Sequence, residues 1–416
     1  MVGERGEMTT DVVVIGGGPG GATTAALVAE GGRDVTLFER NAEPTFKIGE
    51  SLMPGTYRTF ERLGVLDKLK KTAFPRKYSV QFFGASGRGS APFYFNQDNK
   101  HESAVTWQVL RSEFDTMLQD NAAEKGATVV RGASVIEVLF EEERAVGVRV
   151  RMPDDEIKTI RCQVVVDASG QSAFISRKLK IANNEPNLKK ASVFTHYDNG
   201  FRDGGIDEGA TLILQTNDKN AWFWNIPLQD NRVSVGVVGD IDYLFRDRSL
   251  DAQAIFEREL EKCVPMQERL KDAEQVFPMR AAREFSYRAK QISGDGWVLV
   301  GDAYGFLDPV YSSGIFLALK SGEMAADAIL KGFDEGDFSG EMLGKFRAEY
   351  VGGMESIRKL VYAFYDKDFS FGKVLMANPE CQQGIVDILS GDVYTKDVTP
   401  IFKPMGEMCE LPEEDY

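Results

Sequence analysis

The 416-residue sequence has few cysteines and almost no histidines. Its four cysteines lie far apart, without the short spacing of metal ligands, and four thiols cannot cross-link a chain of this length. We interpret the two histidines, His101 and His196, as ordinary hydrogen-bonded or surface residues. We therefore expect no metal site, no disulfide framework and no histidine-based catalytic triad. Scattered free thiols favour a cytoplasmic location.

Positive charge and long apolar runs are also scarce. Asp and Glu total 64 against 49 for Lys and Arg, which gives a net charge of −15. This balance argues against nucleic acid or an anionic membrane as a partner. No apolar run reaches the roughly 18 residues that a membrane span needs. The first ten residues, MVGERGEMTT, lack the apolar core of a signal peptide, and we expect a short unstructured leader. The sequence indicates no oligomeric state.

The pattern of a nucleotide-binding βαβ unit follows this leader. Residues 11–15, DVVVI, are typical of a strand buried on both faces of a parallel sheet. Gly16, Gly18 and Gly21 then form G-x-G-x-x-G before a helix of small residues. These glycines allow, in order, a tight turn, close approach of a pyrophosphate, and close packing of helix on strand. Glu39 ends the second strand, where it can accept ribose hydroxyls. The motif alone leaves FAD and NAD open.

The rest of the chain predicts an α/β fold in which a Rossmann-like domain is interleaved with a second sheet. Further strands are expected near 127–140, 145–152, 163–169 and 296–303, whereas 191–239 contains strands without helices, as in an antiparallel sheet. After residue 314 the apolar spacing is helical. We place the dinucleotide-binding domain at 8–77, 105–190 and 285–335, a β-rich substrate domain at 78–104 and 191–284, and a C-terminal helical region at 336–416.

A second motif narrows the cofactor. Gly301-Asp302 ends a buried strand, and FLDPVYSSGIFLAL follows. This arrangement resembles the second flavin-contacting motif of FAD-dependent aromatic monooxygenases. The resemblance implies FAD, with Asp302 at its ribityl chain, and places Arg111 of VTWQVLRSEFD near the flavin.

Three stretches resemble flavin-dependent halogenases within that wider fold. Trp222, Trp224, Ile226 and Pro227 form W-x-W-x-I-P, and strand periodicity puts both tryptophans on one face as an apolar wall. Core packing is the alternative interpretation. The resemblance implies that this wall separates substrate from flavin.

The second stretch is F-x-x-P-x-x-S-x-G, which runs from Phe306 to Gly314. The resemblance implies that Pro309 and Gly314 adjoin the flavin, and that the amides of Ser312, Ser313 and Gly314 hold a halide. A nest of amides at a helix start is a plausible anion site. The alternative is a flavin-binding turn that holds no halide.

A third stretch supplies the candidate catalytic residue. FPRKYSVQFFG at 74–84 resembles the halogenase segment that carries an essential lysine, which falls on Lys77. A solvated surface charge is the alternative. The resemblance extends from residue 11 to about 395, and the chain is identified as a member of the FADH2-dependent halogenases of the phenol or pyrrole type. Tryptophan halogenases have a glutamate where this sequence has Tyr311, which argues against free tryptophan as the substrate.

This resemblance implies an activity and its partners. Reduced FAD, O2 and chloride or bromide would give hypohalous acid, which is relayed to Lys77 and halogenates an electron-rich phenol or pyrrole, free or bound to a carrier protein. Lys77 could act as a hydrogen-bond donor or as a haloamine, and the base for the ring proton is unassigned. A separate flavin reductase and a role in natural-product biosynthesis are also implied. The alternative is an FAD-dependent aromatic hydroxylase, which would need neither Lys77 nor a halide.

Overall fold

A six-stranded sheet forms the centre of the nucleotide-binding part. The computed structural model describes residues 7–43, 45–97, 99–283 and 286–413. The sheet order is β21-β22-β12-β2-β3-β8, parallel except for β21. Its strands are β2 (Val12–Ile15), β3 (Val35–Glu39), β8 (Thr128–Arg131), β12 (Val164–Asp167), β21 (Ser293–Gly294) and β22 (Trp297–Leu299). The continuous valine runs of β2 and β12 are buried, as their composition predicts.

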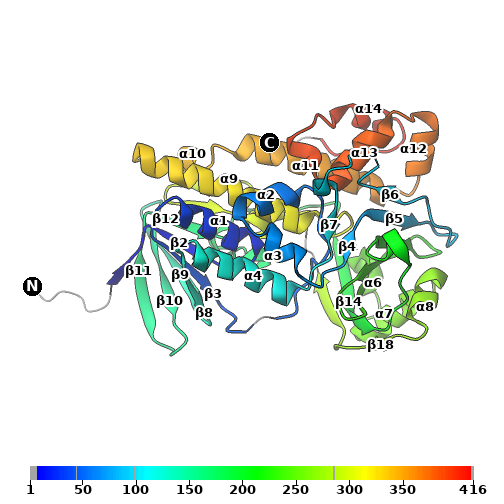
Figure 1. Ribbon diagram of the computed structural model, residues 1–416, viewed down its shortest axis with the longest axis horizontal. Helices are drawn as coiled ribbons and strands as arrows, with labels where there is room; N and C mark the ends of the chain where they lie inside the picture. Colours follow the sequence, from blue (N-terminus) through cyan, green and yellow to red (C-terminus); the bar gives the residue numbers. More distant parts are fainter. Residues whose placement is uncertain (1–6, 44, 98, 284–285, 414–416) are drawn as a thin grey trace, which may run out of the picture.

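Helices cover one face of this sheet. Helix α1 (Pro19–Glu30) packs against α4 (Arg111–Glu124) and α9 (Ser313–Glu335) (Figure 1). Helix α1 can approach the sheet closely because Gly21 has no side chain. A Cβ atom there would lie 2.0 Å from the carbonyl oxygen of Gly16. The role predicted for Gly21 in helix packing therefore agrees with its surroundings.

A smaller sheet, in the order β1-β11-β10-β9, lies beside the central one (Figure 1). It contains β1 (Glu7–Thr9), β9 (Ser134–Glu141), β10 (Arg144–Arg151) and β11 (Ile157–Arg161). The expectation of an unstructured leader is wrong for residues 7–9, because β1 pairs in parallel with β11. The remaining leader residues, 1–6, lie outside the described residues.

The second large sheet has eight strands and carries the tryptophan motif. Its order is β18-β14-β17-β16-β15-β5-β6, with β19 also paired to β14. The strands are β5 (Ser79–Phe83), β6 (Phe93–Tyr94), β14 (Lys190–Asp198), β15 (Thr211–Gln215), β16 (Ala221–Pro227), β17 (Arg232–Asp240), β18 (Glu274–Gln275) and β19 (Arg280–Arg283). All pair antiparallel except β15 with β5. The antiparallel sheet predicted for 191–239 is therefore present.

The two faces of this sheet pack against different partners. Phe223 belongs to a core with Phe256 of α7, whereas Trp222 and Trp224 belong to the core shared with the nucleotide-binding part. The helices beside Phe223 are α6 (Ile241–Leu244), α7 (Ala252–Leu260) and α8 (Val264–Leu270). The strand alternation thus directs both tryptophans toward the flavin-binding side.

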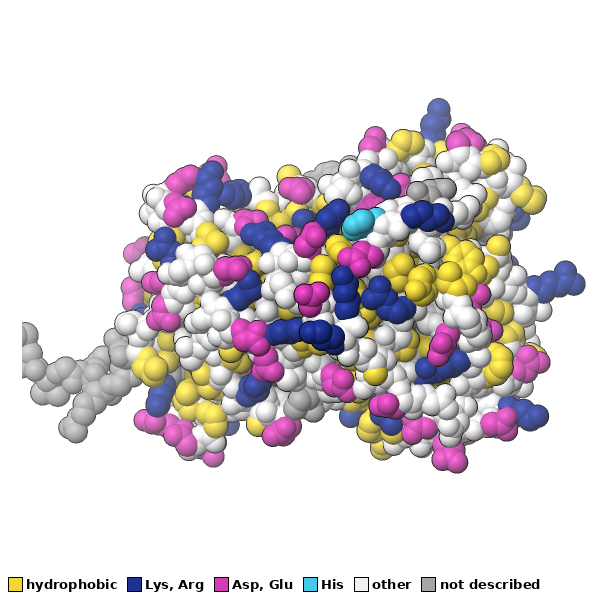
Figure 2. Space-filling view, viewed as in Figure 1, with side chains coloured by type: hydrophobic (Ala, Val, Ile, Leu, Met, Phe, Trp, Pro, Cys, Tyr) yellow, Lys and Arg dark blue, Asp and Glu magenta, His cyan; other side chains and the backbone are white. Residues whose placement is uncertain are grey.

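The chain ends in helices, as predicted. They are α10 (Gly340–Leu343), α11 (Arg347–Tyr365), α12 (Phe371–Ala377), α13 (Cys381–Ser390) and α14 (Phe402–Gly406), and α12 to α14 gather above β5 and β6 in Figure 1. Within the described ranges, no helix is long and apolar enough to cross a bilayer. On the face seen in Figure 2, acidic and basic side chains are interspersed. The limits given for the three domains stay a prediction.

Short elements connect these layers. They are α2 (Thr56–Leu63), α3 (Leu66–Lys70), α5 (Phe174–Lys178), the paired strands β4 (Arg76–Lys77) and β7 (Thr106–Trp107), the three-stranded sheet of β13 (Ala182–Asn184), β20 (Tyr287–Ala289) and β23 (Gly305–Phe306), and 3-10 turns at Glu102–Ala104, Gly170–Ser172, Gly205–Asp207, Gly301–Ala303, Asp392–Tyr394 and Thr399–Ile401.

Candidate active site

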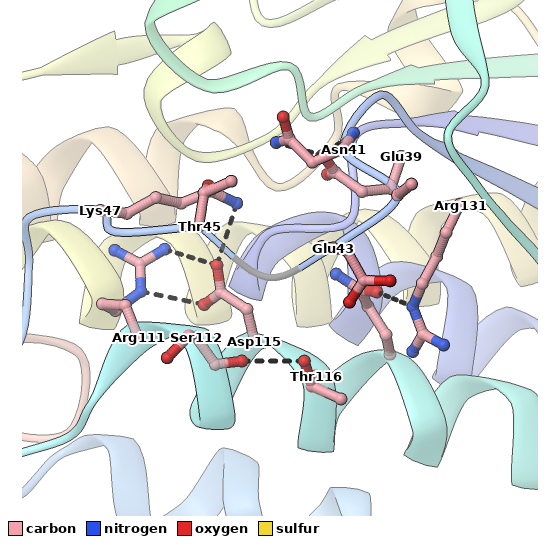
Figure 3. Close-up of a pocket in the computed structure, with 12 residues that line it drawn as sticks. Glu39, Asn41, Glu43, Thr45, Lys47, Arg111, Ser112, Asp115, Thr116 and Arg131 are labelled. Carbon is pink, nitrogen blue, oxygen red and sulfur yellow. Dashed lines mark hydrogen bonds and ion pairs between the residues drawn. The ribbon is translucent and has the colours of Figure 1, made fainter.

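A hollow at the carboxyl end of β3 brings Glu39 and Arg111 to one site (Figure 3). The Glu39 carboxylate accepts hydrogen bonds from the backbone N–H of Gly17 and of Asn41, both at 2.9 Å. The Asn41 side chain donates a third, at 2.8 Å. A carboxylate offers about four lone-pair directions. Glu39 is therefore held in place and can still accept a ribose hydroxyl.

Arg111 is the first residue of α4, and its side chain is held by Asp115, which no motif identified. Its guanidinium donates to both carboxylate oxygens of Asp115, at 2.9 and 3.0 Å, and to the Ile48 carbonyl at 2.6 Å. Lys47 donates to the same aspartate at 3.1 Å. The i, i+4 spacing of Arg111 and Asp115 on a helix was the available signal. Figure 3 shows the two hydrogen bonds of this pair beside the hollow.

The free groups around this hollow fit FAD. A Cβ atom at Gly18 would meet nothing within 4 Å, so the backbone there is open to a pyrophosphate. Asp302 follows β22, and its carboxylate accepts no hydrogen bond from the described residues, which leaves it available to ribityl hydroxyls. Burial raises the pKa of Asp302 to about 6, and the charge of Arg111 opposes that rise.

The segment predicted to hold a halide, Pro309 to Gly314, leads into the N-terminus of α9 and is called the halide turn below. Ser312 has a φ of +59° and precedes the first helical residue, Ser313, which is buried. The backbone N–H groups at the start of a helix have no intrahelical acceptor and carry partial positive charge. Ser312 donates its own N–H to the Pro309 carbonyl at 3.0 Å. The amides of Ser313 and Gly314 are thus placed where an anion can be bound.

The tryptophan wall is fixed by the neighbouring strand and by α11. Trp222 and Trp224 are buried, with ring centroids 6.3 Å apart, and Ile226 and Pro227 continue the buried strand. Gly236 lies opposite Trp224 on β17, and a Cβ atom there would lie 2.3 Å from the indole. Trp224 donates to Ser234 Oγ at 3.1 Å. The indole of Trp224 can lie flat on β17 only because that strand has a glycine here.

The other indole takes part in a hydrogen-bonded chain. Trp222 Nε1 donates to the Tyr365 hydroxyl at 3.1 Å, and Tyr365 donates to Asp308 Oδ2 at 2.9 Å. Asp308 directly precedes Pro309 of the halide turn, and burial raises its pKa to about 7. The Lys190 amine lies 3.9 Å from the centroid of the Tyr365 ring. Neither Tyr365 nor Asp308 was identified from the sequence, since the contact joins residues 57 positions apart.

Lys77 lies inside the protein, at the end of β4. Its side chain is 2% exposed, and its amine donates to Ser51 Oγ and to the Leu52 carbonyl, both at 2.9 Å. The Phe95 ring centroid lies 5.5 Å away. Burial lowers the pKa of Lys77 from 10.5 to about 7. The alternative of a solvated surface charge is therefore wrong.

Known proteins share this arrangement over almost the whole chain. Residues 9–330 match the family model described as FAD binding domain. A 1H-pyrrole-2-carbonyl-[peptidyl-carrier protein] brominase of Pseudoalteromonas luteoviolacea is 32% identical over 92% of this chain and 91% of the relative. The chain belongs to the flavin-dependent halogenases. The corresponding chlorinase of Pseudomonas fluorescens is 28% identical over 97% of the halogenase described here and 94% of that relative.

Solved structures agree with this assignment. The flavin-dependent brominase Bmp2 aligns with a TM-score of 0.86 at 29% identity, covering 96% of the halogenase and 99% of Bmp2. The myxobacterial chondrochloren halogenase CndH aligns with a TM-score of 0.80 at 30% identity, covering 96% of both chains. The predicted family, fold class and FAD cofactor are thus confirmed.

An aromatic cluster joins the parts of the halogenase that the motifs identify. Its rings are Phe82, Phe93, Tyr311, Phe364 and Phe371. Phe82 lies on the strand after Lys77, and its ring centroid is 6.4 Å from that of Tyr311, which lies within the halide turn. Phe364 lies 6.1 Å from Tyr311 and 5.8 Å from Trp222. The segments that carry the lysine, the halide turn and the wall therefore converge on one apolar region.

Removing Glu39 tests the flavin site. We expect Glu39→Ala to weaken FAD binding about 10- to 100-fold, because a charge-assisted hydrogen bond is lost and the Gly17 amide loses its acceptor. Titration of FAD fluorescence measures the dissociation constant. Glu30→Ala, at the exposed end of α1, is the control. Equal affinity in both variants would contradict the role of Glu39.

Proposed function

We propose that this halogenase chlorinates or brominates a small electron-rich ring and that Lys77 directs the halogen to it. A pyrrole-2-carbonyl group on a peptidyl carrier protein is the first candidate substrate, because two relatives are named for that reaction. A phenol is the second. The observation that carries the proposal is the buried amine of Lys77, held by Ser51 and Leu52 and apart from the Glu39–Arg111 hollow.

The proposed division of labour follows from the residues at each site. When bound, reduced FAD would activate O2, and the resulting two-electron oxidant would convert the halide to hypohalous acid. The amides of Ser313 and Gly314 hold the halide at the start of α9. Trp222 and Trp224 keep the substrate away from the flavin. The Lys77 amine then holds the oxidant beside the ring, as a hydrogen-bond donor or as a haloamine.

The proposed partners follow from the same chemistry. A separate flavin reductase supplies FADH2, and a carrier protein presents the ring where the substrate is tethered. Four free cysteines favour the cytoplasm as the location.

A product assay tests the proposal. The protein is supplied with FAD, a flavin reductase, NADH, O2 and either chloride or bromide. The substrates are pyrrole-2-carbonyl on a peptidyl carrier protein and a panel of free phenols and pyrroles. We expect a product whose mass shows that one or more hydrogens have been replaced by halogen, and we expect it only when halide is present. A hydroxylated product that forms without halide would instead support an aromatic hydroxylase.

Removing the hydroxyl of Tyr365 tests whether its link between Trp222 and Asp308 matters for the reaction. We expect Tyr365→Phe to lower the free energy of unfolding by about 1–3 kcal/mol, because Asp308 and the Trp222 indole each lose a partner. We also expect less halogenated product per NADH consumed, since the wall is no longer tied to the halide turn. The control is Tyr362→Phe. Tyr362 lies on the same helix as Tyr365, and its hydroxyl bonds to Glu185. An unchanged product ratio in Tyr365→Phe would contradict this role.

A further inference from the structure

A buried acid–imidazole pair lies beside the segment that holds Lys77. Glu50 Oε1 is 2.5 Å from His196 Nε2, and each residue is 1% exposed. Glu50 belongs to the chain between β3 and α2, whereas His196 lies within β14 of the eight-stranded sheet. The other histidine of the chain, His101, is exposed.

Packing alone does not account for this pair. Its surroundings are aromatic, with the Phe46 and Phe277 ring centroids 4.3 and 5.6 Å from that of His196. Glu50 Oε2 and His196 Nδ1 are buried and have no hydrogen-bond partner among the described residues. Burying two ionisable groups costs free energy that an apolar pair of similar volume would not cost. Buried polar atoms without a partner are rare in folded proteins, so this pair calls for a functional explanation.

The position of Glu50 in the chain indicates that role. Two residues before it, the Ile48 carbonyl accepts from Arg111 at the flavin site. The Glu50 carbonyl accepts from the Val109 N–H at 2.7 Å. The next two residues, Ser51 and Leu52, supply both acceptors of the Lys77 amine. Residues 48–52 thus run from the flavin arginine to the lysine, and the Glu50 side chain ties their midpoint to β14.

We infer that Glu50 and His196 are positioning residues for Lys77: their hydrogen bond holds residues 48–52 against β14 and so keeps the lysine amine at Ser51 Oγ and Leu52 O. This inference rests on the proposed function of Lys77. The same sheet carries the tryptophans, since β14 pairs with β17, which pairs with the tryptophan strand β16.

A merely structural pair predicts a different result from a positioning pair. The informative variant is Glu50→Leu/His196→Leu, which removes both polar groups together and leaves neither one unpaired. If the pair has no role in positioning Lys77, this variant halogenates at the wild-type rate, because apolar residues of similar volume can replace a buried pair without loss of stability. If the pair positions Lys77, the variant can be equally stable but halogenates at least about tenfold more slowly, with KM little changed.

The dependence of activity on pH is a second measurement, and a change in stability alone does not shift its midpoint. The Lys77 amine contacts Ser51 Oγ, Leu52 O and the Phe95 ring, and no acidic side chain of the described residues forms an ion pair with it. Its titration is shifted by burial. When residues 48–52 loosen, water reaches the amine, and we expect the midpoint of the activity–pH curve to rise by about one pH unit or more. Loss of the Glu50 carboxylate would by itself lower the pKa of a nearby amine, so the missing negative charge does not explain a rise.

The experiment compares four proteins with FAD bound: wild type, Glu50→Leu/His196→Leu, Glu50→Gln and Lys77→Ala. Melting temperature, FAD affinity, and kcat and KM are measured for each, with activity followed from pH 6 to pH 9. Glu50→Gln can keep the contact to His196, and we expect it to stay close to wild type. A stable double variant with the wild-type rate and midpoint would overturn the inference. If Lys77→Ala still halogenates at the wild-type rate, the proposed role of Lys77 is wrong. That result is distinct from a failure of the positioning role of Glu50 and His196, which the double variant tests.

Discussion

Replacing Lys77 with alanine is expected to lower the halogenation rate by about a thousandfold, the scale of a lost catalytic group. The amine is buried and has two fixed hydrogen-bond partners, so alanine removes the only group proposed to hold the oxidant at the ring. Flavin binding is expected to stay intact, because the Lys77 amine contacts none of the groups that line the Glu39–Arg111 hollow. Mass detection of halogenated product, together with NADH and O2 consumption, measures both parts of this prediction.

A second lysine separates this effect from the general loss of a positive charge. Lys178 is exposed and donates to a backbone carbonyl, that of Val138. Lys178→Ala should halogenate at nearly the wild-type rate. In Lys77→Ala, O2 and NADH should still be consumed, and the unused oxidant should appear as free hypohalous acid, which a trapping dye detects. Retained halogenation in Lys77→Ala would remove the lysine from the reaction.

The sequence predicts most of the fold because the relevant signals are local. The valine runs of β2 and β12, the glycines after β2 and the alternation of the tryptophan strand each depend on a few neighbouring residues. One exception is β1, where three residues without a strong strand pattern are ordered by pairing with β11, more than 150 positions away. Such pairing leaves no mark in the composition of either segment.

The site could be predicted only in part, for the same reason. Lys77, Glu39 and Asp302 stand in motifs, so their positions could be read from spacing. Their partners could not, because the contacts join distant segments. Ser51 reaches Lys77 across 26 positions, and Tyr365 reaches Asp308 across 57.

His196 shows the limit most clearly. As a single histidine it was interpreted as an ordinary hydrogen-bonded residue, and it does contact an acid. The nearness of that acid to the lysine segment depends on a contact between residues 146 positions apart, which no pattern near either residue predicts.

Replacing Lys77 with methionine is expected to stabilise the protein below about pH 7 and to lose that advantage as the pH rises. The pKa of Lys77 is lowered by burial from 10.5 to about 7, so between these values the unfolded chain binds a proton that the folded chain does not. The free energy of unfolding of the wild type therefore rises with pH across this window, by about 1.4 kcal/mol per pH unit. Methionine has similar length and carries no charge, so its variant lacks this slope.

The measurement is denaturant unfolding of both proteins at pH 6, 7, 8 and 9, with Lys178→Met, at an exposed lysine, as the control. We expect the stability gap between Lys77→Met and wild type to be constant from pH 6 to 7 and to shrink by about 2 kcal/mol from pH 7.5 to 9. A gap that does not depend on pH would mean that Lys77 keeps its ordinary pKa. A buried amine that costs stability at neutral pH supports the role proposed for Lys77, because burial lowers its pKa to about 7 and leaves it partly uncharged at that pH.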